Sequence, residues 1–328
     1  MKDKQNYTVI NKTKSNFDRL YDSKDPRDYF KYLGELDYII PHLAQPIFNQ
    51  IIQARSESQS GPVTVLDLGA SYGVNGALMK YQLDYEALRQ RYTAPALQVL
   101  DSEEVLELDR AFYKSWPKNA GVRVIGHDVS VNAVTYAEAC GSVDLGMAIN
   151  FEEDDPSPAQ IKALADVDLI VSTGSIGYIS EKTFARIARF TDPARKPWVV
   201  SFVIRMFPFD EIQKTLEGLG LETEKFEGAT FVQRRFADRE EMLATVASVE
   251  ARGIDTVNHE RQGLYHADLF VSRPREAIEA CPLSQLVSIV SGANKPWTVG
   301  TNVLAGYGAD APQPSRGNRG GLTLAHSA

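Results

Sequence analysis

The chain has 328 residues, of which 43% are hydrophobic and 24% charged, a composition typical of a soluble globular protein with one large α/β domain and appendages. Its formal net charge of −8 argues against a dedicated nucleic-acid binder, because contacts to phosphates need a concentrated basic surface. The sequence contains neither an apolar run long enough to span a membrane nor an apolar secretory signal near its start. We therefore expect neither a nucleic-acid nor a membrane partner.

The cysteines and histidines give no sign of a metal site. Cys140 and Cys281 are the only cysteines, and neither belongs to a metal-binding motif. Two cysteines do not make a disulfide framework, and the five histidines are scattered along the chain. We predict no metal and a reducing, cytoplasmic location. A homodimer is compatible with the sequence.

Residues 1–60 are predicted to form a helical segment that covers the main domain as a lid. Residues 1–24 are polar and are expected to be loosely ordered. Apolar and aromatic side chains then recur at helical spacing from Asp25 to Ser56, and Pro41 divides this stretch into two helices.

Strand-like and helix-like segments alternate after residue 60, which predicts a parallel sheet with helices on both faces. The expected strands are Val63–Leu66, Val122–Ile125, Gly146–Ile149, Val167–Ser172 and Trp198–Val203. Residues 84–120 are predicted to be a helical insert within this domain, which spans residues 61–275.

The later part of the domain predicts an antiparallel edge. We expect helices at Asp210–Gly218 and Arg239–Arg252, a strand near Leu221–Glu227 or Phe231–Phe236, and a last strand at Tyr265–Ser272. The fold class is thus α/β, a Rossmann-like, mostly parallel sheet of seven strands with one antiparallel edge strand. Residues 276–328 are predicted to be an extension that ends in a flexible tail.

The strongest functional signal follows the first strand, in the segment Asp67-Leu-Gly69-Ala70-Ser71-Tyr72-Gly73. Glycines allow the backbone to approach a ligand closely, and ligands of open α/β sheets bind at the carboxyl ends of the strands. An acid just before the glycine loop would repel a pyrophosphate but suits a cationic amino-acid group.

This segment resembles motif I of the class I S-adenosylmethionine-dependent methyltransferases. The resemblance implies that residues 69–73 wrap the methionine part of the cofactor and that Asp67 helps to hold its amino group. Asp128, at the end of the second expected strand and followed by Val129, resembles the family's acid that accepts hydrogen bonds from both ribose hydroxyls. The insert makes the spacing between these two acids longer than in the family.

Two further segments resemble the family less specifically. Asn150 and Phe151 match the position that contacts the adenine, although an ordinary strand end explains them nearly as well. Thr173 and Gly174 follow the fourth expected strand and would face the cofactor. Asp128 or Ser130 is also a candidate N-cap of the next helix, and Ser130 fits this role better.

The acceptor is expected to be a small, partly apolar molecule. Its candidate contacts come from the N-terminal helices and from the loops after the fourth and fifth strands, and they are Tyr29, Tyr32, Tyr178, Arg205 and Phe207. We assign no catalytic residue; His266, His42 and Tyr178 are candidate general bases.

Three alternatives stay open. The acceptor could be a protein or peptide, or the chain could bind the cofactor without catalysis. A short-chain dehydrogenase that uses NAD(P) is a further alternative, because Tyr178 and Lys182 form a YxxxK pattern. Ser175 lies too close to Tyr178 in sequence for that family's arrangement, and this alternative leaves Asp67 unexplained.

Overall fold

A computed structural model describes residues 22–289. The loosely ordered start predicted for residues 1–24 lies largely outside this range, as does most of the predicted C-terminal tail. The two predicted N-terminal helices are present as α3 (Arg27–Glu35) and α4 (Ile40–Ser56). Pro41 lies in the first turn of α4, where backbone N–H groups have no partner within the helix, so its lack of an N–H costs no hydrogen bond.

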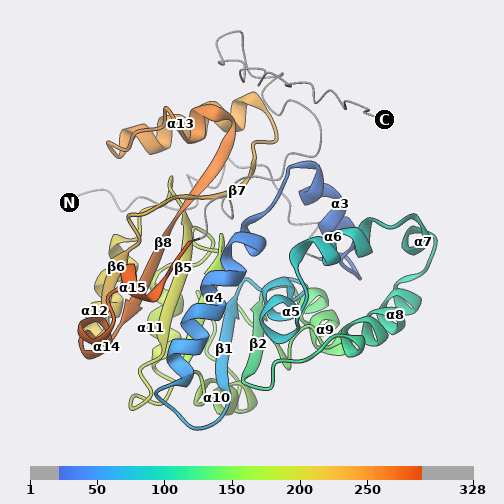
Figure 1. Cartoon of the computed structure of the whole chain (residues 1–328), viewed down its shortest axis with the longest axis horizontal. Coiled ribbons are helices and arrows are strands. Elements are labelled where there is room, and N and C mark those ends of the chain that lie inside the picture. Colours follow the sequence, from blue (N-terminus) through green and yellow to red (C-terminus); the bar gives the residue numbers. More distant parts are fainter. Residues whose placement is uncertain (1–21, 290–328) are drawn as a thin grey trace, which may run out of the picture.

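Five parallel strands form the centre of the sheet in the order β3-β2-β1-β4-β5 (Figure 1). Their bounds are β1 (Val63–Leu68), β2 (Val122–Asp128), β3 (Leu145–Ala148), β4 (Leu169–Thr173) and β5 (Trp198–Ile204). The strand order is that of a doubly wound Rossmann-like sheet, which confirms the predicted fold class.

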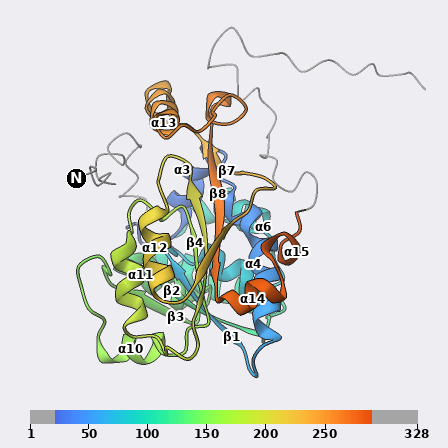
Figure 2. The same cartoon turned by 90° about the vertical axis from the view of Figure 1, so that its left-hand side faces the viewer.

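Helices cover both faces of the sheet, as the two sides of Figure 2 show. One face packs against α4, α5 (Val74–Lys80) and α9 (Val131–Cys140). The other packs against α10 (Pro158–Leu164), α11 (Glu181–Ala188) and α12 (Asp210–Gly218). The side chains of β1 alternate between the two cores, with Val63 and Val65 on one face and Leu66 and Leu68 on the other.

The far edge of the sheet is antiparallel and contains one more strand than predicted. Its elements are β6 (Glu222–Lys225), β7 (Phe231–Arg235), α13 (Arg239–Ala251), the short helix η1 (Glu260–Gln262) and β8 (Leu264–Arg273). β8 runs antiparallel to β5, and β6 and β7 pair with opposite ends of β8. Both candidate segments for the late strand are therefore real, and the sheet has eight strands instead of seven.

The predicted insert forms α6 (Tyr85–Thr93), α7 (Pro95–Gln98) and α8 (Ser102–Ser115). These helices lie to one side of the sheet, where they share an aromatic-rich core with α3, α5 and α9 (Figure 1). After β8 the chain adds α14 (Arg275–Ala280) and α15 (Leu283–Leu286), and α15 packs against α4. None of the helices in residues 22–289 has the length and apolar character that a membrane span requires.

Candidate functional site

The candidate site lies where the strand order reverses. From β1 the chain moves outward to β2 and β3, and it then returns to place β4 on the other side of β1. Open α/β sheets bind ligands in the crevice at such a switch point, outside the carboxyl ends of the strands. Asp67 near the end of β1, Thr173 at the end of β4 and Asp128 at the end of β2 all lie at this edge.

The loop after β1 has an unusual backbone that only a few residue types adopt easily. Gly69 and Gly73 have φ angles of +76° and +75°, and Ser71 between them has a φ of +49°, which is uncommon for a residue with a side chain. The N–H groups of Gly69 and Ala70 both donate to the carbonyl of His127, at 2.9 and 2.8 Å. The loop is thereby fixed against the end of β2.

Asp67 is fully buried and only half satisfied. Its Oδ1 accepts a hydrogen bond from Asn75 Nδ2 at 3.2 Å, whereas its Oδ2 has no partner within the described part of the chain. Burial raises the pKa of Asp67 to about 7, and the hydrogen bond from Asn75 only partly opposes this shift. A cationic group at Oδ2 would supply the missing partner and favour the ionised carboxylate.

Asn75 is a residue of this site that the sequence interpretation missed. It lies in the first turn of α5, and its Nδ2 also donates to Thr173 Oγ1 at 2.9 Å. It therefore links β1 to β4 across the switch point. The available signal was its position two residues after Gly73, directly beyond the glycine loop.

Asp128 is half-buried and holds the glycine loop from the other side. Its Oδ2 accepts from the N–H of Ser71 at 2.9 Å, and its Oδ1 accepts from the N–H of Ser130 at 3.0 Å. Ser130 is the N-cap of α9, since its Oγ accepts from the N–H of Ala133. Each oxygen of Asp128 can accept one more hydrogen bond, which leaves the carboxylate able to bind two hydroxyls.

The predicted adenine contacts lie one strand further out. Asn150 closes a turn after β3, where its Oδ1 accepts from the N–H of Glu152 at 3.1 Å. Phe151 is buried, and its ring stacks on His127 with centroids 4.7 Å apart. Val129, beside Asp128, is exposed.

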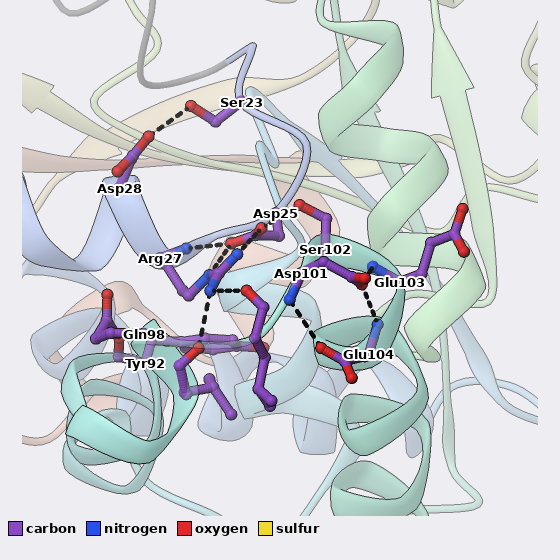
Figure 3. Close-up of polar contacts among 12 residues, drawn as sticks. Ser23, Asp25, Arg27, Asp28, Tyr92, Gln98, Asp101, Ser102, Glu103 and Glu104 are labelled. Carbon is purple, nitrogen blue, oxygen red and sulfur yellow. Dashed lines mark hydrogen bonds and ion pairs between the residues drawn. The ribbon is translucent and has the colours of Figure 1, made fainter.

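Residues 22–27, which we call the N-terminal strap, tie the glycine loop to the insert. Tyr72 donates its hydroxyl to the carbonyl of Ser23 at 2.8 Å. Arg27 donates to the carbonyls of Leu97 and Leu100 at 2.8 and 2.7 Å, and Asp25 accepts from Ser102 at 2.6 Å (Figure 3). The strap therefore connects the loop after β1 to α7 and α8.

The candidate acceptor contacts from the N-terminal helices differ in position. Tyr29 is buried, with its ring edge-on to Tyr72 and Tyr38, whereas Tyr32 is 45% exposed. Burial, with a smaller contribution from nearby Asp67, raises the pKa of Tyr38 to about 12. Tyr38 thus joins the site close to Thr173 and Asp67.

The candidate contacts from the later loops do not gather at one point. Tyr178 is 56% exposed, in the loop after β4. Arg205 is buried in an ion pair with Glu260, 3.1 Å between Nη1 and Oε2, and also donates to the carbonyl of Asp255. Phe207 is buried with its ring against Gly177.

The candidate bases are also dispersed. His266 Nδ1 forms a hydrogen bond with Thr230 Oγ1 at 2.9 Å. Burial lowers the pKa of His266 to about 3, so the ring is neutral. His42 lines a small cavity between the α3–α4 link and α6, together with Tyr38, Tyr85 and Glu86. Within residues 22–289, no three His, Cys, Asp or Glu side chains gather in a way that could hold a metal.

No protein-family model matches the chain, and no curated protein matches it in sequence. Solved structures of S-adenosylmethionine-dependent methyltransferases do match its fold. Magnesium protoporphyrin IX methyltransferase from Synechocystis PCC 6803, with bound S-adenosylmethionine, is 13% identical over 83% of this chain and 99% of that one, with a TM-score of 0.36.

Two other matches have similar values. The plantazolicin methyltransferase BamL, solved with S-adenosylhomocysteine, is 10% identical over 83% of this chain and all of that one, with a TM-score of 0.37. A TehB-like methyltransferase from Corynebacterium glutamicum is 16% identical over 67% of this chain and 86% of that one, with a TM-score of 0.33.

Proposed function

We propose that the chain binds S-adenosylmethionine at the switch point and transfers its methyl group to a small molecule. This proposal rests on the buried carboxylate of Asp67, one oxygen of which lacks a partner; Asp67 directly precedes a tight glycine loop whose Ser71 N–H donates to the second acid, Asp128. A cationic amino group beside Asp67 and a diol beside Asp128 fit these two acids. An anionic ligand would leave the buried carboxylate of Asp67 without a counter-charge.

The residues around the crevice divide the binding task. Asp67 would hold the amino group, Asp128 the two ribose hydroxyls, and residues 69–73 the main chain of the methionine part. Thr173 and Gly174 would line the side of the crevice that is formed by the end of β4. When bound, the cofactor supplies a methyl group on a positively charged sulfur.

The chain's own contribution to the reaction is alignment and the exclusion of water. α3 supplies the buried aromatic side chain of Tyr29 beside the glycine loop, where its ring lies edge-on to Tyr72 of that loop. Such a cover supports a small, partly apolar acceptor over a folded protein. His266, which burial keeps neutral, is a poor proton acceptor in this setting.

Two observations weigh against a dinucleotide. The anion of Asp67 at the glycine loop would repel a pyrophosphate. The serine and tyrosine of the dehydrogenase pattern also occupy one short turn, since the carbonyl of Ser175 accepts from the N–H groups of Tyr178 and Ile179. Ser175 packs on Gly69, whereas Tyr178 is largely exposed.

Titration calorimetry with S-adenosylmethionine, S-adenosylhomocysteine and NADP⁺ tests the proposal. We expect the first two to bind and NADP⁺ to give no heat. Transfer of a radiolabelled methyl group to a panel of small molecules and to peptides then separates the acceptor classes. Binding with no transfer to any acceptor would favour a non-catalytic cofactor-binding protein.

A further inference from the structure

Gln233 lies at a β-bulge that turns its side chain out of the ladder. Val232 pairs with His266 on β8 and Arg234 pairs with Tyr265, so Gln233 has no partner in the register. Its carbonyl accepts instead from the N–H of Ile39 at 2.9 Å. Bulges of this kind redirect a side chain, and they are frequent beside functional sites.

The redirected side chain reaches the switch point. Gly174, the residue after β4, has a φ of +82°, and a Cβ added to it would lie 2.1 Å from Gln233 Nε2. The amide therefore lies against the backbone of Gly174, next to Thr173. A strand at the far edge of the sheet thus places a polar group beside the crevice between β1 and β4.

Within residues 22–289, no hydrogen bond joins the side-chain amide of Gln233 to the protein, and the amide atoms are not among the fully buried polar atoms that lack a partner; the residue is 7% exposed. Its charged neighbours are engaged elsewhere: Arg234 pairs with Glu241 and Arg235 with Asp37. The amide is therefore available to a ligand in the crevice.

The direction from which Gln233 approaches separates it from the proposed cofactor contacts. Asp128 and Asn150 lie on the β2–β3 side of β1, whereas Gln233 arrives from the β5–β8–β7 side. A ligand of Gln233 would therefore occupy the opposite half of the crevice from the nucleoside. Tyr38, next to Thr173 and adjacent in sequence to Ile39, supplies an aromatic surface there.

We propose that Gln233 is the residue that positions the methyl acceptor, by a hydrogen bond to a hydroxyl of an aromatic or otherwise apolar small molecule; this inference rests on the proposed function. A primary amide both donates and accepts, which matches a neutral hydroxyl better than a charged group. The pairing of Arg234 and Arg235 with acids also favours an acceptor without negative charge at this point.

The test uses the complete chain, S-adenosylhomocysteine and phenol as the probe. Gln233→Met removes the amide and keeps the length of the side chain. Gln213→Met on α12, whose amide bonds to Glu217, is the matched control. Calorimetry measures S-adenosylhomocysteine affinity, saturation-transfer NMR measures phenol binding to the complex, and thermal unfolding reports stability.

We expect Gln233→Met to weaken phenol binding at least tenfold, to change S-adenosylhomocysteine affinity less than twofold, and to leave the melting temperature equal or higher. The control should match the wild type. Equal phenol binding by Gln233→Met, or no phenol binding by the wild-type complex, would overturn the inference. A tenfold loss of S-adenosylhomocysteine affinity would assign the amide to the cofactor, and a marked loss of stability would assign it a structural partner.

These outcomes distinguish the inference from the proposed function. If the wild type does not bind S-adenosylhomocysteine, the proposed function fails and this inference fails with it. If the wild type binds S-adenosylhomocysteine but the phenol result is negative, only the role of Gln233 is lost.

Discussion

Replacing Asp67 by asparagine should weaken cofactor binding and stabilise the ligand-free protein at alkaline pH. The carboxylate is fully buried, its Oδ2 lacks a partner in the described structure, and burial raises its pKa from 3.8 to about 7. At about 1.4 kcal/mol per pKa unit, the ionised form costs the folded protein up to about 4 kcal/mol. Asparagine has the same shape and no charge, so it removes this cost.

The sign of the pH dependence follows from the raised pKa. The contribution of Asp67 to stability is fully present below about pH 4, where both states are protonated, and it is lost as the pH rises to about 7. The free energy of unfolding of the wild type should therefore fall over this range because of Asp67. The advantage of Asp67→Asn should be about 2 kcal/mol larger near pH 8 than near pH 5.5.

The affinity for the cofactor should rise with pH, whereas the free energy of unfolding falls. An ionised Asp67 is needed to hold a cation, so the wild-type affinity for S-adenosylmethionine should rise from about pH 5.5 to about pH 7. In Asp67→Asn the affinity should be at least about tenfold lower, since a charge-assisted hydrogen bond contributes about 1.5–3 kcal/mol, and this part of the pH dependence should disappear.

Urea unfolding and calorimetry at the two pH values measure both effects. Asp144→Asn is the matched control, because Asp144 is a half-buried acid just before β3 at the opposite edge of the sheet, already paired with Lys80 and Lys118. That change should lower stability and leave affinity unaltered. Equal cofactor affinity of Asp67→Asn and the wild type would refute the reasoning about the site, and a stability difference independent of pH would refute the reasoning about the pKa.

Three further changes test other parts of the site. Asp128→Asn should weaken S-adenosylmethionine binding about tenfold and lower stability by about 1–3 kcal/mol, because the amide keeps one acceptor but sets its NH2 against the other backbone N–H; unchanged calorimetric affinity would exclude the ribose role. Gly174→Ala should destabilise the fold by about 1–2 kcal/mol in urea unfolding, because its φ is +82°, whereas Gly34→Ala on α3, with open space around it, should be neutral or stabilising. Arg27→Gln should lower stability by about 1–3 kcal/mol and speed proteolysis within α7 and α8, because the hydrogen bonds from Arg27 to the carbonyls of Leu97 and Leu100 are lost. An unchanged cleavage rate would contradict a role for the strap.

The sequence predicted the helices and strands well because hydrophobic periodicity and turn residues are local signals. α12 begins and ends at the predicted residues, and the helical insert and both N-terminal helices are present. The sequence did not indicate that β6 and β7 both pair with β8, because strand pairing depends on residues far apart in the chain. The count of seven strands was wrong for this reason.

The motif around Asp67 and the acid at Asp128 could be found from the sequence alone, because a buried strand that ends in an acid and a glycine loop has a recognisable order of residue types. The tertiary structure alone decided what surrounds them. It paired Arg205 with Glu260 inside the protein, placed Asn75 between Asp67 and Thr173, and brought Gln233 from the far edge to Gly174. Such contacts follow from the packing of the sheet, which depends on the whole chain and not on any one segment.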